Sequence, residues 1–109
     1  MIKFTKLLFL LTLFINISSA ENFLFSVIIA IYNTGKYLND SIGSLFNQTI
    51  DFEKIQIILV NDGSSDQSEE ISLIYKNKYP NNIIYIKTEH HGVSFARNVG
   101  IDYAEGKFI

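Results

Sequence analysis

A chain of 109 residues has room for no more than one small domain. Its hydrophobic fraction of 48% and charged fraction of 18% are typical of a folded globular protein and exclude an intrinsically disordered one. The absence of cysteine excludes disulfide bonds and thiolate metal sites, and a net charge of −2 without a block of Lys or Arg argues against a nucleic-acid partner.

The first 20 residues differ in kind from the rest of the chain. Two lysines, Lys3 and Lys6, precede an apolar run over residues 7–17, and the small residues Ser18-Ser19-Ala20 follow. This order is typical of a secretory signal peptide. An uncleaved N-terminal membrane anchor is the alternative, although a membrane span needs about 20 apolar residues. We therefore expect residues 1–20 to direct the chain to the secretory route or to a membrane, with the domain facing the cytosol if the leader is an anchor.

Residues 21–109 alternate strand and helix patterns, which indicates one α/β domain. Near-continuous apolar runs predict parallel strands that are covered on both faces, and these runs span residues 25–31, 55–60 and 83–87. A fourth strand is expected to begin at residues 107–109. Apolar or small residues at helical spacing follow each of the first three runs. The expected fold is a Rossmann-like parallel sheet of about four strands with flanking helices.

The loops after the first three strands carry polar residues that suit a binding site. Tyr32 and Asn33 follow the first strand, and residues 62–66 (DGSSD) follow the second. Residues 89–92 (EHHG) follow the third strand and lead to Arg97. Open α/β sheets bind their ligands at the edge where the carboxyl ends of the strands meet. Since an aromatic ring can stack on a base, a carboxylate can accept its N–H and a guanidinium can position an anion, these loops predict a site for a nucleotide with a diphosphate.

Four segments of the chain resemble the family 2 glycosyltransferases, which have the GT-A fold. In chain order they are residues 26–33 (SVIIAIYN), 42–49 (IGSLFNQT), 60–66 (VNDGSSD) and 92–101 (GVSFARNVGI), the last with 104–106 (AEG) after it. Their order and spacing match the family, and together they cover nearly all of the chain after the leader. The resemblance implies that residues 21–109 are the incomplete N-terminal half of a GT-A fold, the half that binds the nucleotide-sugar donor.

The resemblance also implies roles for particular residues. Tyr32 stands where the family stacks an aromatic ring on the base, and Asp62 stands where a carboxylate recognises the base, typically uracil. Arg97 stands where an arginine approaches the nucleotide, and Ala30 occupies a position near the base that is often Pro or Thr in relatives. The nucleotide-binding residues expected on this pattern are Ala30, Tyr32, Asn33, Asp62, Gly63, Ser64 and Arg97.

The main departure from the family is the absence of its catalytic groups. Relatives carry an Asp-x-Asp-type motif a few residues beyond the strand that begins near Phe108, and its carboxylates hold a divalent cation, Mn²⁺ or Mg²⁺, on the diphosphate. This sequence contains neither those metal ligands nor the acceptor-binding half with its catalytic base. We therefore assign no catalytic and no metal-binding residue, and we expect the isolated 109-residue chain to be inactive.

The expected function of the complete enzyme is transfer of a sugar from a nucleotide sugar, a UDP-sugar on the family pattern, to an acceptor hydroxyl in polysaccharide biosynthesis. The acceptor, whether glycan, lipid or protein, is not encoded in this part of the pattern. The alternative is a non-catalytic nucleotide-sugar-binding remnant or an inactive gene fragment.

Simpler structural roles stay open for several of these residues. Asp62 can hydrogen-bond within its own turn, Tyr32 can pack on the core at a strand end, and Arg97 can pair with acidic residues on its helix. Asp66 fits the start of the second helix better than a ligand contact, because an acid there favours the helix dipole. The histidines at residues 90–91 are expected to be solvated in their loop, because no third metal ligand is spaced to join them.

Overall fold

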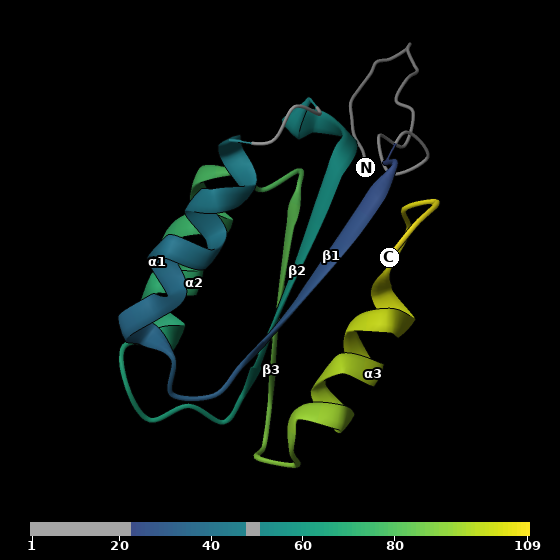
Figure 1. Ribbon diagram of the computed structural model, residues 1–109. Helices are drawn as coiled ribbons and strands as arrows, with labels where there is room; N and C mark the ends of the chain where they lie inside the picture. The colour runs from purple at the N-terminus through teal and green to yellow at the C-terminus, as the bar shows by residue number, and fades with distance from the viewer. Residues whose placement is uncertain (1–22, 48–50) are drawn as a thin grey trace, which may run out of the picture.

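The computed structural model describes residues 23–47 and 51–109, so the predicted leader over residues 1–20 lies outside the described part. Within that part, three β-strands alternate with three α-helices (Figure 1). The bounds are β1 Phe25–Ile31, α1 Gly35–Gly43, β2 Ile55–Asp62, α2 Ser68–Lys78, β3 Ile83–Thr88 and α3 Val93–Tyr103, with short 3₁₀ turns η2 Ser44–Asn47 and η3 Phe52–Lys54. Of the helices in these two ranges, none has the length and hydrophobicity that a membrane span requires.

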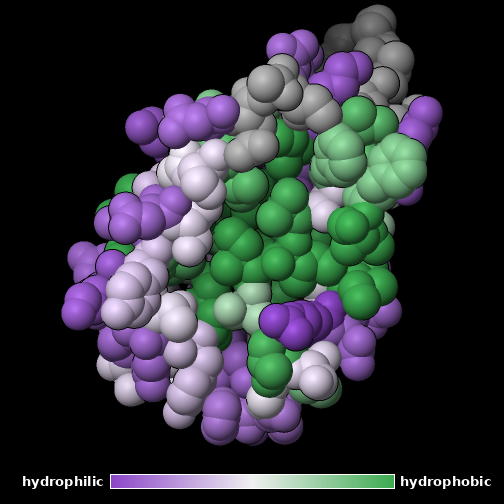
Figure 2. Space-filling view, in the orientation of Figure 1, coloured by the Kyte–Doolittle hydropathy of each residue, from purple (hydrophilic) through white to green (hydrophobic). Residues whose placement is uncertain are grey.

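The three strands form one parallel sheet in the order β1-β2-β3, which confirms the predicted α/β fold. Helices α1 and α2 cover one face of the sheet and α3 covers the other (Figure 1). The predicted fourth strand is present as a single parallel bridge, in which Phe108 pairs with Phe25 on the outer side of β1. Figure 2 shows hydrophobic residues gathered over β1, between α1 and α3, where this edge strand is otherwise unpaired in the described residues.

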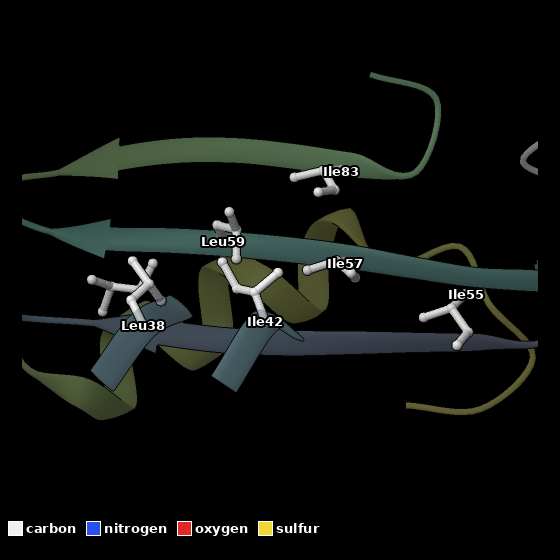
Figure 3. Packing of buried hydrophobic residues seen from close by; sticks show 7 residues of the cluster. Leu38, Ile42, Ile55, Ile57, Leu59 and Ile83 are labelled. Carbon is white, nitrogen blue, oxygen red and sulfur yellow. The ribbon is translucent and has the colours of Figure 1, made fainter. Parts of the chain in front are cut away.

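Strand β2 is the centre of the domain, and each of its eight residues is buried. Side chains on one of its faces, Ile57 and Leu59, meet Leu38 and Ile42 of α1 in the larger hydrophobic core (Figure 3). The strand continues two residues beyond its apolar run, because it stays paired with β3 as far as Asp62 opposite Thr88. Asp62 therefore projects from a rigid strand end rather than from a free loop.

The opposite face of the sheet carries α3 at short range. Ala96 and Gly100 are the buried residues of this helix, and Ala96 packs with Ile58 and Val60 of β2. A Cβ atom on Gly100 would overlap the side chain of Ile28, so only glycine lets the helix approach this closely. Small residues thus fix how deeply α3 lies on the sheet.

A buried polar cluster fastens the far end of α3 to the start of β2. Gln56 is 1% exposed, and its Oε1 accepts hydrogen bonds from Ser26 Oγ at 2.6 Å and from the Glu105 amide at 2.8 Å. Ser26 Oγ in turn accepts one from the Gly106 amide at 2.7 Å. These bonds direct the chain after α3 toward Phe108 and its bridge to β1.

Candidate nucleotide-binding site

A pocket of about 140 Å³ opens at the carboxyl end of β1 and β2. Its lining residues come from the ends of β1 and β2, the loop after β3 and the first turn of α3, and they are Ala30, Ile31, Tyr32, Asp62, His90, Val93 and Ala96. Sites for whole drug-sized ligands are larger, about 300–1,000 Å³. The pocket therefore has the size for a ring system rather than for a complete nucleotide sugar.

Asp62 is the charged group at the floor of this pocket and is only 2% exposed. Its Oδ1 accepts hydrogen bonds from Thr88 Oγ1 at 2.7 Å and from the His91 amide at 3.0 Å. Its Oδ2 accepts hydrogen bonds from the Gly92 amide at 2.8 Å and, at 3.2 Å, from the same His91 amide. Burial by itself raises the pKa of this carboxyl, but the donated hydrogen bonds and the neighbouring His90 together hold the pKa below its ordinary value. Asp62 is therefore an ionised acceptor at neutral pH that also organises the loop after β3.

Tyr32 and His90 form the exposed wall of the pocket. Their rings stack with centroids 4.1 Å apart and an interplanar angle of 21°. His90 Nδ1 also lies 3.3 Å from Asp62 Oδ2, although the imidazole side chain is 57% exposed. Because Tyr32 is 45% exposed, it is not the core-packing residue that the simpler interpretation required.

Sequence reasoning did not place His90 in the site. The spacing of possible metal ligands argued against a metal site at residues 90–91, and His90 was therefore expected to be solvated. That spacing does not reveal that the His90 ring stacks on Tyr32. The topology of parallel strands did predict that the loop over residues 89–92 reaches the same sheet edge as Tyr32 and Asp62, but not which of its side chains lines the pocket.

Three predicted residues shape the pocket without lining it. The Asn33 amide donates to Ser64 Oγ at 2.9 Å, and the Ser65 amide donates to Asn33 Oδ1 at 2.8 Å. These bonds join the loops that follow β1 and β2. Gly63 has a φ of 80°, and a Cβ there would lie 2.9 Å from the His90 amide nitrogen. A side chain at Gly63 would therefore push the His90 loop away from the pocket.

Asp66 holds the start of α2, as its position in the sequence predicts. Its Oδ1 accepts from the Ser68 amide at 2.9 Å, and its Oδ2 accepts from the Gly35 amide at 3.0 Å at the start of α1. The Ser68 side chain, followed by these amides, lowers the pKa of the Asp66 carboxyl against a smaller opposing effect of burial. Asp66 is thus a brace between two helix starts and lies outside the pocket lining.

Arg97 lies in the second turn of α3 and is exposed, and it does not line the pocket. Within residues 23–47 and 51–109 it forms no salt bridge, so the alternative of a surface arginine is met in its exposure but not in the pairing with Asp102 or Glu105. The helix turns Ala96 toward the sheet and leaves its neighbour Arg97 in solvent. Its contact with a nucleotide stays a prediction.

The divalent cation that the resemblance implies has no ligand set in the described residues. No group of three or more His, Asp or Glu side chains there is arranged to hold a metal ion. Asp62, the buried carboxylate of the pocket, already accepts hydrogen bonds on both oxygens. The described residues therefore do not fit the metal.

The family model of Glycosyl transferase family 2 matches residues 26–109 of the chain. The chain belongs to this family. Among its relatives in the family, the minor teichoic acid biosynthesis protein GgaB of Bacillus subtilis is 58% identical over 88 residues, and GgaA of the same organism is 52% identical over 89 residues. The matches cover 81% and 79% of this chain but only 10% and 20% of GgaB and GgaA.

Solved structures with a similar fold show the same partial correspondence. TarS of S. aureus, residues 1–349, aligns with a TM-score of 0.69 and 33% identity, covering 79% of this chain and 26% of that fragment. The same TarS fragment has also been solved with UDP-GlcNAc. A mannosyltransferase of Pyrobaculum calidifontis, solved with GDP-Man and Mn²⁺, aligns with a TM-score of 0.67 at 18% identity and shows the shared fold. The chain thus corresponds to the N-terminal part of a GT-A fold.

Proposed function

We propose that this chain forms the donor-nucleotide-binding part of a glycosyltransferase that transfers a sugar from a UDP-sugar to an acceptor hydroxyl. The observation that carries the proposal is the pocket in which an exposed Tyr32 ring stands beside the ionised, buried Asp62 carboxylate. The complex of TarS with UDP-GlcNAc supports the choice of a uridine nucleotide, because TarS aligns with 79% of this chain at 33% identity.

The pocket geometry suits recognition of the base. A base stacked on the Tyr32 ring would bury one of the base's two faces. Asp62 Oδ2 would accept a hydrogen bond from an N–H at the edge of the base. Base–aromatic stacking contributes about 1–3 kcal/mol. Uracil has an N–H at N3, whereas cytosine has an acceptor there, so the carboxylate should discriminate between the two bases. The diphosphate would leave the small pocket, and the exposed Arg97 is the cation that we assign to it.

Relatives suggest the process in which the complete enzyme acts. GgaB and GgaA are named for minor teichoic acid biosynthesis, and both exceed 50% identity over the matched residues. We assign this chain to the same kind of cell-surface polymer synthesis. The divalent cation of the complete family would neutralise charge on the leaving diphosphate. The acceptor, the catalytic base and the metal ligands belong to parts of the fold that the described residues do not include.

Calorimetric titration of the full chain with UDP and CDP tests the nucleotide assignment. UDP should bind at least about tenfold more tightly, because CDP leaves Asp62 facing a second acceptor. Equal affinities would contradict base recognition by Asp62. Failure of both nucleotides to bind would favour the alternative of an inactive gene fragment.

The predicted leader bears on the compartment in which the domain works. We propose that residues 1–20 anchor the chain with its domain facing the cytosol, because family members draw their nucleotide sugars from that compartment. N-terminal sequencing of the expressed protein tests this proposal. An intact Met1 is expected, and a new terminus near Glu21 would show a cleaved signal peptide instead.

A further inference from the structure

His90 makes the two contacts that a nucleobase would make in this pocket. Its flat ring stacks on Tyr32 with centroids 4.1 Å apart and a tilt of 21°. A ring nitrogen at its edge, Nδ1, lies 3.3 Å from Asp62 Oδ2. A base that stacked on Tyr32 and presented an N–H to Asp62 would need the same ring face and the same carboxylate oxygen.

The surroundings of Asp62 show why the His90 imidazole and a nucleobase would compete for the same position. A carboxylate offers about four acceptor positions. Thr88 Oγ1 donates to Oδ1, and the Gly92 amide donates to Oδ2 at 2.8 Å. The His91 amide is shared between the two oxygens, at 3.0 Å from Oδ1 and 3.2 Å from Oδ2. His90 Nδ1 also approaches Oδ2, at 3.3 Å, so a base that donated an N–H to this oxygen from the Tyr32 side would meet the imidazole there.

We propose that His90 is an intramolecular substitute for the nucleobase, which the donor nucleotide must displace in order to bind. This inference rests on the proposed function and adds a specificity-determining residue to it. Only a ring that both stacks on Tyr32 and donates an N–H to Asp62 replaces both contacts of the imidazole. A ring that lacks such a donor loses one of them and competes poorly.

The contacts of the His90 imidazole are weak enough for a bound nucleotide to displace it. Its contact with Asp62 is long, and its side chain is 57% exposed, so the ion-pair contribution is small. The stacking contact is the larger part, at a strength typical of aromatic pairs. Removing the imidazole should therefore tighten nucleotide binding by about threefold to tenfold.

The loop around His90 allows the ring to leave without unfolding the site. The adjacent backbone amides of His91 and Gly92, rather than the imidazole, hold the loop on Asp62. Gly92 has a φ of 102°, which places these amides toward the carboxylate. A side-chain rotation at His90 leaves both hydrogen bonds in place.

Calorimetric titration of the full chain with UDP tests the inference on the wild type, His90→Ala and Glu89→Gln. His90→Ala should bind UDP about threefold to tenfold more tightly than the wild type. Glu89→Gln alters the neighbouring exposed residue of the same loop, which lines no part of the pocket, and should match the wild type. Unchanged or weaker binding by His90→Ala would overturn the inference while the proposed function stands.

Proton NMR of the imidazole provides a readout that does not depend on affinity. The His90 ring signals, assigned by their loss in His90→Ala, should be shifted by the Tyr32 ring current in the free protein. Saturating UDP should move them to the positions of a solvent-exposed histidine. Signals that keep the ring-current shift at saturation would overturn displacement. Failure of both the wild type and His90→Ala to bind UDP would overturn the proposed function together with this inference.

Discussion

The two ends of β2 use the same device for different purposes. Each end carries a buried polar side chain, Gln56 at the start and Asp62 at the finish, with exposed fractions of 1% and 2%. Each accepts hydrogen bonds from backbone amides beside α3: Glu105 donates to Gln56, and Gly92 donates to Asp62. One strand thus holds both ends of a helix that follows it by some 30 residues or more in the sequence.

Charge and neighbours, rather than burial, separate the two ends. Gln56 is neutral, and its partners are the Ser26 hydroxyl and backbone groups, so that its cluster is complete within the protein. Asp62 is charged and borders a pocket whose outer wall, Tyr32 and His90, is exposed. In the proposals above, Asp62 can bind a nucleobase because the exposed His90 side chain beside its Oδ2 can be displaced. Gln56 has no such exposed partner among its hydrogen bonds to Ser26 and Glu105.

The largest effect is expected from Gln56→Leu. The substitution leaves the Ser26 hydroxyl and the Glu105 amide without their acceptor, and each buried group left unpaired costs about 1–3 kcal/mol. We expect the free energy of unfolding to fall by about 3 kcal/mol in urea denaturation. UDP affinity of the folded fraction should stay within about twofold of the wild type. A larger loss of affinity would mean that the two ends are coupled through α3.

A smaller effect on stability, with a pH signature, is expected from Asp62→Asn. The pKa of Asp62 is lowered in the folded state, so its stabilisation is present above the unfolded value of about 3.9 and is lost as the pH falls through the lower folded value. The variant should lose about 2 kcal/mol at pH 7 and should show a flatter decline below about pH 4. UDP affinity should fall with it.

Urea denaturation from pH 7 to pH 3 measures this signature. Asp66→Asn is the matched control, because the pKa of Asp66 is also lowered but its carboxylate braces α1 and α2 outside the pocket. It should also flatten the acid profile, while UDP affinity stays closer to the wild type than in Asp62→Asn. Equal losses of affinity in both variants would remove the distinction between a bracing and a binding carboxylate.

The smallest effect on stability is expected at Tyr32, where binding alone should change. Because its ring is 45% exposed, Tyr32→Ala should alter the free energy of unfolding by less than about 0.5 kcal/mol. UDP affinity should fall about tenfold through the lost stacking. Tyr32→Phe keeps the ring and should bind UDP as the wild type does. Full affinity in the alanine variant would show that the base lies elsewhere.

The site was predictable from the sequence to the extent that it depends on strand ends. Apolar runs identify β1 and β2, and the family pattern identifies Tyr32 and Asp62 just beyond those runs, where the pocket is found. Asn33 and Ser64 were predicted to belong to the same site, but the structure gives them a loop-bracing position. A motif records that a residue belongs to a loop, and only the folded loop shows which of its side chains face the pocket.

The sequence by itself determined the parallel α/β fold, the family and the edge of the sheet at which the site lies, because hydrophobic periodicity and motif order are local properties of the chain. Only the tertiary structure decided that His90 covers Tyr32 and that Gln56 and Asp62 hold the two ends of α3. These contacts join residues 29 to 58 positions apart. They form only after the sheet has assembled and the close approach of Gly100 to Ile28 has set the depth of α3.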